Sequence, residues 1–318
     1  MESRKIIQPH LTIVIPLYNE ADVFNKFVKE LSSQLNKLNI QWEVLWVNDG
    51  STDETFEMVK RVCLKDNKHR GISFSRNFGK EAAMYAGLKH AKGDAVVIMD
   101  GDGQHPVELL PKMVELWQNN SGDVISARKN ERKSDSFLGR IRASLFNKIL
   151  KALSGIDMEG ASDYRLINRQ VVDAILSTPE RIRFFRGLSC WVGFRHFSIP
   201  FDVPCRLNGI SKWNFRSLTR LSLDAITGFS TQPLLWVFTA GLIGLLISAL
   251  LLIQAIWSWA FGIAVSGWTS ITVLVLFFGS ANLLAAGIVG LYLARVFEEV
   301  KQRPHYIINE DTLSMNSR

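Results

Sequence analysis

Two aspartates separated by one residue, Asp100 and Asp102, follow an uninterrupted apolar run that begins at Ala95. A run of this length is typical of a strand buried on both faces. The two carboxylates then fall at the carboxyl end of that strand, where open α/β sheets bind ligands. They suit a Mg2+ or Mn2+ ion that completes its coordination with phosphates and water. Taken alone, the tripeptide is more typical of a solvated turn, so the rest of the chain must distinguish the two interpretations.

Strand and helix patterns alternate from residue 11 to residue 127. Repeated units of this kind predict an α/β fold with a mostly parallel sheet and helices on both faces. No G-x-G-x-x-G sequence follows the first strand, which disfavours a dinucleotide-binding Rossmann domain. The predicted strands cover residues 11–16, 44–47, 71–74, 123–127 and the run that begins at Ala95, and the predicted helices cover 21–36, 53–64, 80–90 and 106–117.

Polar residues follow each of the first four predicted strands. They include Glu20 after the first, Asp49 after the second, Lys80 after the third, and Asp100 after the fourth. Taken one at a time, each of these strand ends is more typical of a turn or a helix cap than of a site. Four polar strand ends on one edge of a parallel sheet, however, predict a binding site.

The chain contains no Asp, Glu, Lys, Arg or His from Ala225 to Ala294. Two apolar stretches within this region, 234–257 and 271–292, are each long enough to span a hydrocarbon core of about 30 Å. Lys and Arg flank the pair on both outer sides, which predicts a multi-pass protein of the cell (inner) membrane with the α/β domain and both termini in the cytoplasm. The alternative is a helical hairpin buried in a soluble protein.

The net charge of +7 is concentrated between Arg128 and Arg220, where Lys and Arg outnumber Asp and Glu. A basic region directly before a membrane segment indicates anionic headgroups or phosphorylated substrates. No nucleic-acid-binding signature accompanies it. Cys63, Cys190 and Cys205 lack paired spacing, which favours reduced thiols in a cytosolic domain. The N-terminal residues lead straight into a strand, so we expect no signal peptide.

Three motifs, at 48–55, 75–83 and 99–106, resemble glycosyltransferase family 2. More narrowly, they resemble the polyprenyl-phosphate glycosyltransferases, relatives of bactoprenol glucosyltransferase and dolichol-phosphate-mannose synthase. The likeness extends through Arg-x-x-Gly-x-Ser-Lys-Trp at 206–213 to Arg-Pro-His-Tyr at 303–306. It implies a GT-A fold, a nucleotide-sugar donor, a divalent cation and a polyprenyl phosphate acceptor. One departure is visible: the family's Asp-Ala-Asp-Leu-Gln has glycine at positions 101 and 103 here.

The resemblance also implies roles for individual residues. Asp102 is the principal metal ligand, assisted by Asp100, and Asp102 and Asp163 are the expected catalytic residues. The expected nucleotide-sugar-binding residues are Pro16, Tyr18, Glu20, Asp49, Lys80 and Asp100, and the expected acceptor-phosphate-binding residues are Arg206, Ser211 and Lys212.

The role of Asp163 stays open at this point. In the relatives, the matching aspartate is the proposed catalytic base. A lipid monophosphate has a second pKa of about 6 and is already largely anionic at pH 7, so it has little need of a base. Asp163 either acts as a base, or orients the acceptor, or forms a structural ion pair with Arg165.

Two basic segments are ambiguous as well. Residues 137–154 have the pattern of an amphipathic helix lying in the membrane interface, although the same pattern suits a helix packed on the core. Arg181, Arg183 and Arg186 surround two phenylalanines, and they either bind phosphate or face solvent or lipid.

We expect a cytosolic GT-A domain at 1–210, a juxtamembrane segment at 211–230, two transmembrane helices within 231–294, and a cytosolic tail at 295–318. The expected activity is inverting transfer of a sugar, from UDP-linked glucose or N-acetylhexosamine, to a lipid such as undecaprenyl phosphate, for cell-envelope glycan modification. A processive polysaccharide synthase is one alternative, but its Q-x-x-R-W motif is absent. A non-catalytic nucleotide-sugar-binding scaffold is the other. Glycines in the apolar stretches permit helix packing within one hairpin or in a homo-oligomer.

Overall fold

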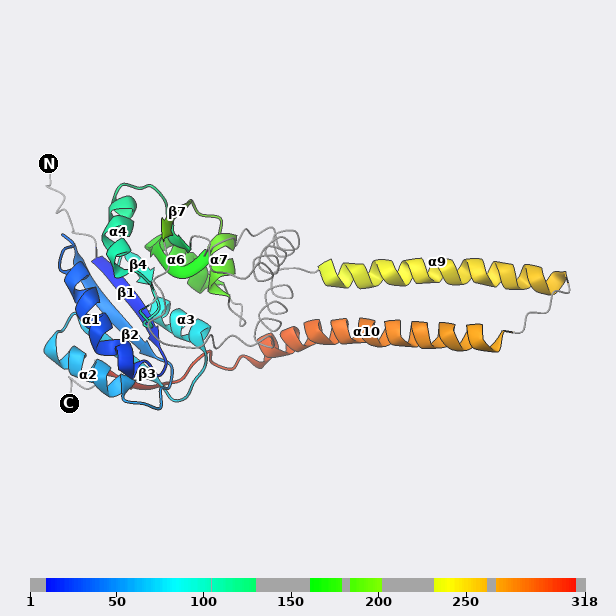
Figure 1. Cartoon of the computed structure of the whole chain (residues 1–318), viewed down its shortest axis with the longest axis horizontal. Helices are drawn as coiled ribbons and strands as arrows, with labels where there is room; N and C mark the ends of the chain where they lie inside the picture. Colours follow the sequence, from blue (N-terminus) through cyan, green and yellow to red (C-terminus); the bar gives the residue numbers. More distant parts are fainter. Residues whose placement is uncertain are drawn as a thin grey trace. The chain divides into compact units, whose positions relative to one another are not determined.

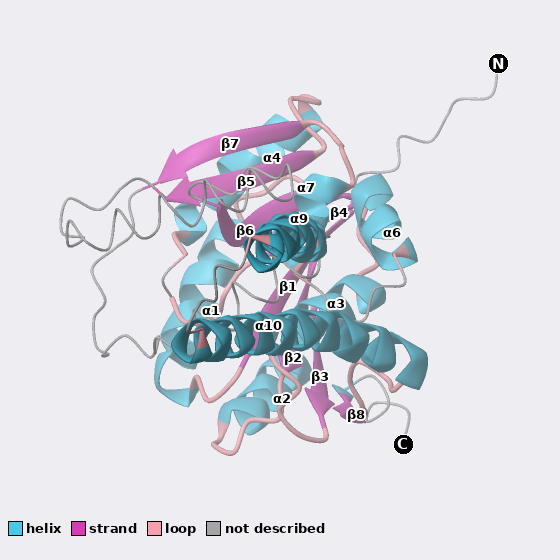
Figure 2. Cartoon of the chain, turned by 90° about the vertical axis from the view of Figure 1, so that its right-hand side faces the viewer, coloured by secondary structure: helices cyan, strands magenta, loops and turns pink. Residues whose placement is uncertain are grey.

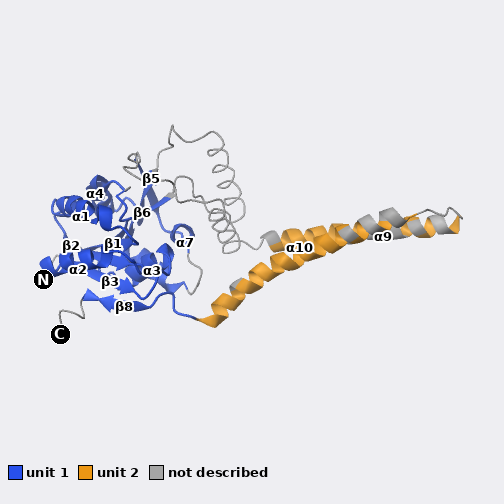
Figure 3. Cartoon of the chain, turned by 60° about the horizontal axis from the view of Figure 1, so that its bottom comes forward, with its two compact units in different colours: residues 1–213, 303–318 blue, residues 214–302 orange. Residues whose placement is uncertain are grey.

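The computed structural model describes residues 10–103, 105–129, 161–178, 184–201, 232–261 and 267–312. The chain forms two compact units (Figure 3), one comprising Met1–Trp213 with Arg303–Arg318 and the other Asn214–Gln302. We call the first the sheet unit and the second the helical unit. The expected amphipathic helix at 137–154 and the juxtamembrane segment at 211–230 lie outside the described residues.

In the described part of the sheet unit, an eight-stranded mixed sheet has the order β7-β5-β6-β4-β1-β2-β3-β8 (Figure 2). Strands β4, β1, β2 and β3 are parallel neighbours, as are β5 and β7, whereas β6 is antiparallel to both of its neighbours. This confirms an α/β fold with a mostly parallel sheet. The strands are β1 (His10–Leu17), β2 (Gln41–Asn48), β3 (His69–Phe74), β4 (Ala95–Ile98), β5 (Val124–Lys129), β6 (Ala161–Asn168), β7 (His196–Phe201) and β8 (Ile308–Asp311).

Helices cover both faces of the sheet (Figure 1). One face packs against α1 (Ala21–Leu35), α2 (Thr55–Lys65) and α4 (Leu110–Gln118), which the short 3₁₀ helix η1 (Val107–Leu109) precedes. The other face packs against α3 (Lys80–His90), α6 (Arg169–Ser177) and α7 (Phe185–Trp191). Helix α3 has the bounds that the sequence predicts, residues 80–90.

Strand β1 shows why the central strands carry apolar side chains on both faces. Side chains alternate between the faces of a strand, so Ile13 and Ile15 enter the core under α1 and α2 while Val14 enters the core under α3. All three side chains are fully buried. Because both faces are covered, the strand has no polar side.

The segment after the last long helix returns to the sheet. Strand β8 pairs antiparallel with β3, next to a bidentate ion pair in which Arg70 Nη2 lies 2.6 Å from Asp311 Oδ2. Tyr306 stacks on Phe74 with ring centroids 4.9 Å apart. Within the segment expected to form a cytosolic tail, 295–318, residues Ile308–Asp311 thus form an edge strand of the sheet. The four residues Ile-Asn-Glu-Asp of β8 carry no apolar alternation that would predict it.

The helical unit contains α9 (Gln232–Ala260) and α10 (Trp268–Lys301). Within the described residues one stretch is long and apolar enough to cross a membrane, Phe277–Lys301 in α10, and none of its apolar window is buried. The corresponding apolar stretch in α9, Leu234–Gly244, is shorter. The predicted pair of transmembrane helices is therefore not confirmed.

Candidate active site

A cavity of about 380 Å³ opens at the carboxyl ends of β4, β1, β2 and β3. These four strands are parallel, so the loops that follow them meet at one edge of the sheet. The lining comes from all four strand ends and from the start of α3: Pro16, Leu17, Tyr18, Glu20, Asp49, Asn77, Gly79, Lys80, Ala83, Asp100, Gly101 and Asp102. The structure thus brings together every predicted donor-site and metal-site residue.

The loops after β1 and β2 are joined to each other. The backbone N–H of Asn19 donates to Ser51 Oγ at 3.0 Å, and that of Thr52 donates to Asn19 Oδ1 at 2.9 Å. The N–H of Glu20 donates to Thr55 Oγ1 at 2.9 Å. These bonds fix the wall of the cavity that carries Tyr18 and Glu20.

The loop after β3 is held by Asp49. The carboxylate of Asp49 is buried, and its two oxygens accept the backbone N–H groups of Phe78 at 2.7 Å and Gly79 at 2.9 Å. Burial raises the pKa of Asp49 although the two N–H bonds act against this rise. Asp49 therefore shapes the loop that leads into Lys80, in addition to lining the cavity.

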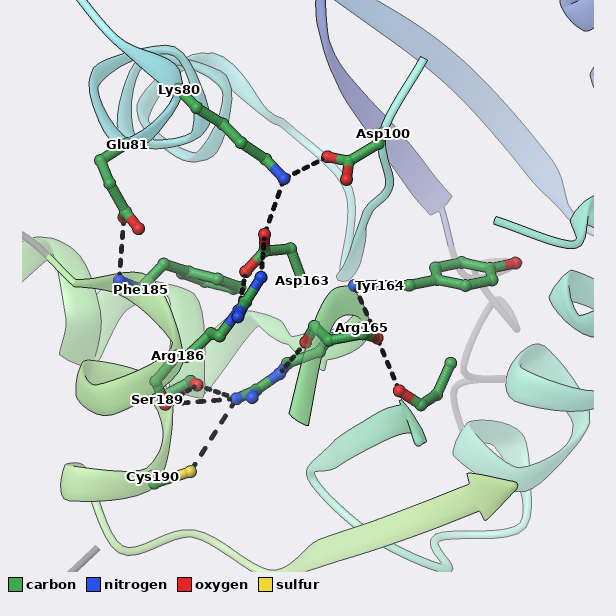
Figure 4. Close-up of polar contacts among 12 residues, drawn as sticks. Lys80, Glu81, Asp100, Asp163, Tyr164, Arg165, Phe185, Arg186, Ser189 and Cys190 are labelled. Carbon is green, nitrogen blue, oxygen red and sulfur yellow. Dashed lines mark hydrogen bonds and ion pairs between the residues drawn. The ribbon is translucent and has the colours of Figure 1, made fainter. Parts of the chain in front are cut away.

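Lys80 lies between two carboxylates that come from different strands (Figure 4). Its Nζ is 2.5 Å from Asp100 Oδ1 and 2.6 Å from Asp163 Oδ2. Asp100 lines the cavity, whereas Asp163 on β6 is only 5% exposed and is not part of the lining. Lys80 therefore connects the predicted donor side of the site with Asp163.

Asp163 has a second cationic partner, Arg186 on α7. Arg186 Nε donates to Asp163 Oδ1 at 2.6 Å, and Arg186 Nη2 donates to Asp163 Oδ2 at 2.9 Å. Burial alone would raise the pKa of Asp163, but the bonds from Arg186 and the charges of Arg186 and Lys80 hold it well below its usual range. Asp163 is thus an ionised carboxylate with three charge-assisted bonds.

An ion pair between Asp163 and Arg165, one of the three alternatives for Asp163, is not what the structure shows, because Asp163 pairs with Lys80 and Arg186 instead. Arg165 is buried, and its guanidinium donates to the carbonyl oxygen of Ser162 at 3.0 Å and to Ser189 Oγ. These partners hold the Arg165 side chain against β6 and α7. Arg186, not Arg165, lies beside Asp163. Proximity in the sequence suggested the wrong arginine.

Two polar residues of this cluster were not singled out as site residues by sequence reasoning. The sequence leaves Arg186 as either phosphate-binding or facing solvent or lipid, and it indicates no role for Glu81. Glu81 accepts the backbone N–H of Phe185 at 2.9 Å. Burial raises the pKa of Glu81 to about 7, and the charge of Asp163 adds to the rise. The only available signal was the position of Glu81 directly after Lys80, in the 75–83 motif.

The residues present fit a divalent cation that the substrate helps to coordinate. Asp100 and Asp102 supply carboxylate oxygens to one cavity. Within the described residues no group of three or more His, Cys, Asp or Glu side chains is placed to hold a metal ion. Mg2+ is commonly held by one or two carboxylates plus substrate phosphates, and this donor set matches that pattern.

The acceptor side of the predicted site is not described. Arg206, Ser211 and Lys212 all lie outside the described residues, so their predicted contacts with a phosphate stay predictions. The cavity residues lie together in the structure, and the roles that the sequence predicts for them stay predictions.

Comparison with known proteins places the chain in a family. The profile of "Glycosyl transferase family 2" matches residues 12–176. An "Uncharacterized glycosyltransferase sll0501" of Synechocystis is 37% identical over 302 residues, covering 94% of this chain and 95% of that protein. The "Bactoprenol glucosyl transferase" of Shigella phage SfII is 36% identical over 306 residues, covering 94% of this chain and 97% of that protein.

Among solved structures, glucosyl-3-phosphoglycerate synthase from Mycobacterium tuberculosis, in complex with Mn2+, UDP and glucosyl-3-phosphoglycerate, is similar with a TM-score of 0.48. It is 18% identical, and the match covers 69% of this chain and 78% of that one. Each of the two sequence relatives named above is more than one-third identical to this chain over nearly its whole length. The chain is a glycosyltransferase and belongs to glycosyltransferase family 2.

Proposed function

We propose that the protein transfers a sugar from a UDP-linked donor, glucose or an N-acetylhexosamine, to the phosphate of a polyprenyl lipid such as undecaprenyl phosphate, with inversion at the anomeric carbon. The observation that carries the donor half is the cavity in which Asp100, Asp102 and Lys80 meet the loops after β1 and β2. Relatives named as bactoprenol glucosyl transferases, matched over nearly their whole length, support the lipid acceptor.

Each part of the cavity has a task in this proposal. Pro16, Tyr18, Glu20 and Asp49 receive the nucleoside, and Lys80 faces the donor phosphates with its positive charge. Asp100 and Asp102 would hold the cation, which would supply Lewis-acid stabilisation of the departing diphosphate. Arg206, Ser211 and Lys212 hold the acceptor phosphate, whose anionic oxygen attacks the anomeric carbon from the face opposite the leaving group.

We also propose that the helical unit anchors the enzyme in the membrane as two spans. Large apolar side chains point outwards on both helices, among them Phe238 on α9 and Leu283 on α10, each at least two-thirds exposed. Such a surface is stable in lipid and costly in water. The apolar stretches cover enough residues to reach across a hydrocarbon core.

The path of the chain supports an even number of crossings. In the chain, α9 and α10 lie between β7 and β8, which both belong to the sheet unit. A chain that starts and ends in a unit on one side of a membrane crosses that membrane an even number of times. If α10 is one crossing, we propose that α9 is the other.

Labelling tests this topology. Ser266→Cys, in a variant lacking the three native cysteines, is expected to react with a membrane-impermeant maleimide added to intact spheroplasts, whereas a cysteine at Lys37 is expected to react only after lysis. Reaction of both positions only after lysis would overturn the two-span arrangement.

Transfer of radiolabel tests the activity. Purified protein with Mn2+ or Mg2+, undecaprenyl phosphate and a panel of labelled nucleotide sugars is expected to yield a butanol-extractable, acid-labile labelled lipid from one UDP-sugar. Asp102→Asn should abolish this transfer and leave the protein folded. Absence of lipid labelling from every donor, or substantial transfer by Asp102→Asn, would overturn the proposal.

A further inference from the structure

We infer that Asp163 and Arg186 are positioning residues of the donor site, which draw Lys80 away from Asp100 so that Asp100 can bind the divalent cation while Lys80 receives a donor phosphate. This inference rests on the proposed function. It assigns Asp163 a task on the donor side, although its carboxylate does not line the cavity.

The register of the sheet brings the two carboxylates together. Strands β4 and β6 are antiparallel, with Ile98 opposite Arg165. Asp100 lies two residues beyond Ile98 and Asp163 two residues before Arg165, so both carboxylates lie at the same end of this pair of strands. Like charges close together repel each other, and the ammonium of Lys80 between them, at 2.5 Å and 2.6 Å, neutralises that repulsion.

Arg186 keeps Asp163 in place when Lys80 moves. Its guanidinium binds both carboxylate oxygens in the two-pronged arrangement that fixes orientation as well as charge. A carboxylate with only a lysine partner would turn with that lysine. Asp163 instead remains a fixed acceptor on the far side of Lys80 from Asp100 (Figure 4).

Lys80 and a divalent cation compete for Asp100. A cation on Asp100 and Asp102 would repel the ammonium that contacts Asp100 Oδ1. Asp163 offers Lys80 a second anion that it already contacts, so the lysine can leave Asp100 with little rearrangement. Without the charge of Asp163, Lys80 would pair with Asp100 alone and oppose metal binding.

The contacts of Asp163 are poorly suited to a general base. A base needs a free lone pair within reach of the proton and a pKa near the working pH. Both oxygens of Asp163 already accept charge-assisted bonds from Arg186, and Oδ2 also contacts Lys80. The low pKa of Asp163 agrees with this geometry.

The test is binding of Mn2+ alone and of UDP with Mn2+, in the absence of acceptor and turnover. Asp163→Asn should weaken both by about tenfold, because Lys80 then pairs only with Asp100. Lys80→Met should bind Mn2+ alone at least as tightly as the wild type. In the Lys80→Met background, Asp163→Asn should change Mn2+ binding by less than about twofold. The reason is that Asp163 affects metal binding through its contact with Lys80.

Arg186→Lys separates positioning from charge. It keeps the charge and loses the two-pronged contact, so it should weaken Mn2+ binding less than Arg186→Met does. The matched control is Asp123→Asn. Asp123 also binds an arginine through two bonds, from Arg195 Nε at 3.1 Å and Nη2 at 3.2 Å, but it lies outside the cavity lining. This control should bind Mn2+ and UDP as the wild type does, and circular dichroism should show all variants folded.

The outcomes distinguish the inference from the proposed function. Failure of the folded wild type to bind UDP with Mn2+ would overturn the proposed function and the inference with it. Normal wild-type binding together with unchanged Mn2+ and UDP affinity in both Asp163→Asn and Arg186→Met would overturn the inference alone. The inference would also be overturned if the double variant Lys80→Met/Asp163→Asn lost more Mn2+ affinity than the single variant Asp163→Asn.

Discussion

Gly50 and Arg76 approach so closely that a β-carbon on Gly50 would lie 2.3 Å from the carbonyl carbon of Arg76. Gly50 also has a φ of +64°, which disfavours any residue with a side chain. The obstacle is backbone of the loop after β3, which cannot move without disturbing Asp49 and Lys80. The contact joins two of the four loops that build the cavity.

Gly50→Ala should therefore lower the free energy of unfolding by about 2–4 kcal/mol. Gly101→Ala is the matched comparison. Its β-carbon would meet Leu17 Cδ2 at 2.3 Å, but this atom is the end of a side chain that can turn into the cavity. We expect a loss of unfolding free energy below about 1 kcal/mol. Thermal unfolding of both variants checks this, and equal losses would contradict the explanation.

The strand ends could be predicted because parallel strands place their carboxyl ends at one edge. Asp49, Lys80 and Asp100 each follow an apolar strand, and local patterns suffice to locate such strands. The apolar stretches of the helical unit were equally visible, since the absence of charge needs no knowledge of tertiary contacts.

The partners of these residues could not be predicted in the same way. Arg186 meets Asp163 across 23 positions of sequence, and Asp311 meets Arg70 across 241. No periodicity encodes such contacts, because they depend on how α7 and β8 dock onto the sheet. Arg165 is the partner that the sequence suggests for Asp163, because without a fold only residues close in the sequence can be matched.

Glu81 should make stability fall as the pH rises. Its pKa in the fold is about 7 against 4.5 when unfolded, so the folded state holds the proton more tightly. Ionisation therefore costs stability between these two values. Glu81→Gln cannot ionise, and its amide oxygen can still accept the N–H of Phe185. It should match the wild type near pH 4.5 and exceed its stability at pH 8 by about 1–2 kcal/mol.

Melting temperatures at pH 5 and pH 8 check this prediction. Glu30→Gln is the control, because Glu30 is exposed and lies 3.9 Å from Lys26. The difference in melting temperature between Glu81→Gln and the wild type should grow with pH, whereas the difference between Glu30→Gln and the wild type should not. An advantage of Glu81→Gln that is the same at both pH values would argue against an unusual pKa.

The Arg70–Asp311 ion pair should hold β8 on β3. It is mostly buried, with two contacts from the guanidinium at 3.3 Å and 2.6 Å, whereas the Lys26–Glu30 pair is exposed. Asp311→Asn should cost about 1 kcal/mol, and Glu30→Gln close to nothing. Hydrogen exchange should speed up at the N–H of Ser75, which donates to the carbonyl of Ile307 at 3.0 Å. Unchanged exchange there would mean that β8 is held by other contacts.

Asp49→Asn should weaken UDP binding by about tenfold or more without unfolding the protein. An asparagine offers one oxygen, so its NH2 group would face the second of the two N–H groups that Asp49 now accepts. Two donors repel each other, and the loop from Asn77 to Lys80 must shift. Hydrogen exchange of this loop should rise together with the dissociation constant of UDP.

Asp53→Asn provides the matched control for that change. Asp53 also accepts two backbone N–H groups, from Thr55 at 3.0 Å and Ala21 at 3.3 Å, but it does not line the cavity. Its replacement should alter UDP binding by less than about threefold. If Asp49→Asn weakens UDP binding while exchange of the loop stays at the wild-type rate, then Asp49 acts by direct contact with the nucleotide. Loss of binding with faster exchange identifies the loop as the element through which Asp49 acts.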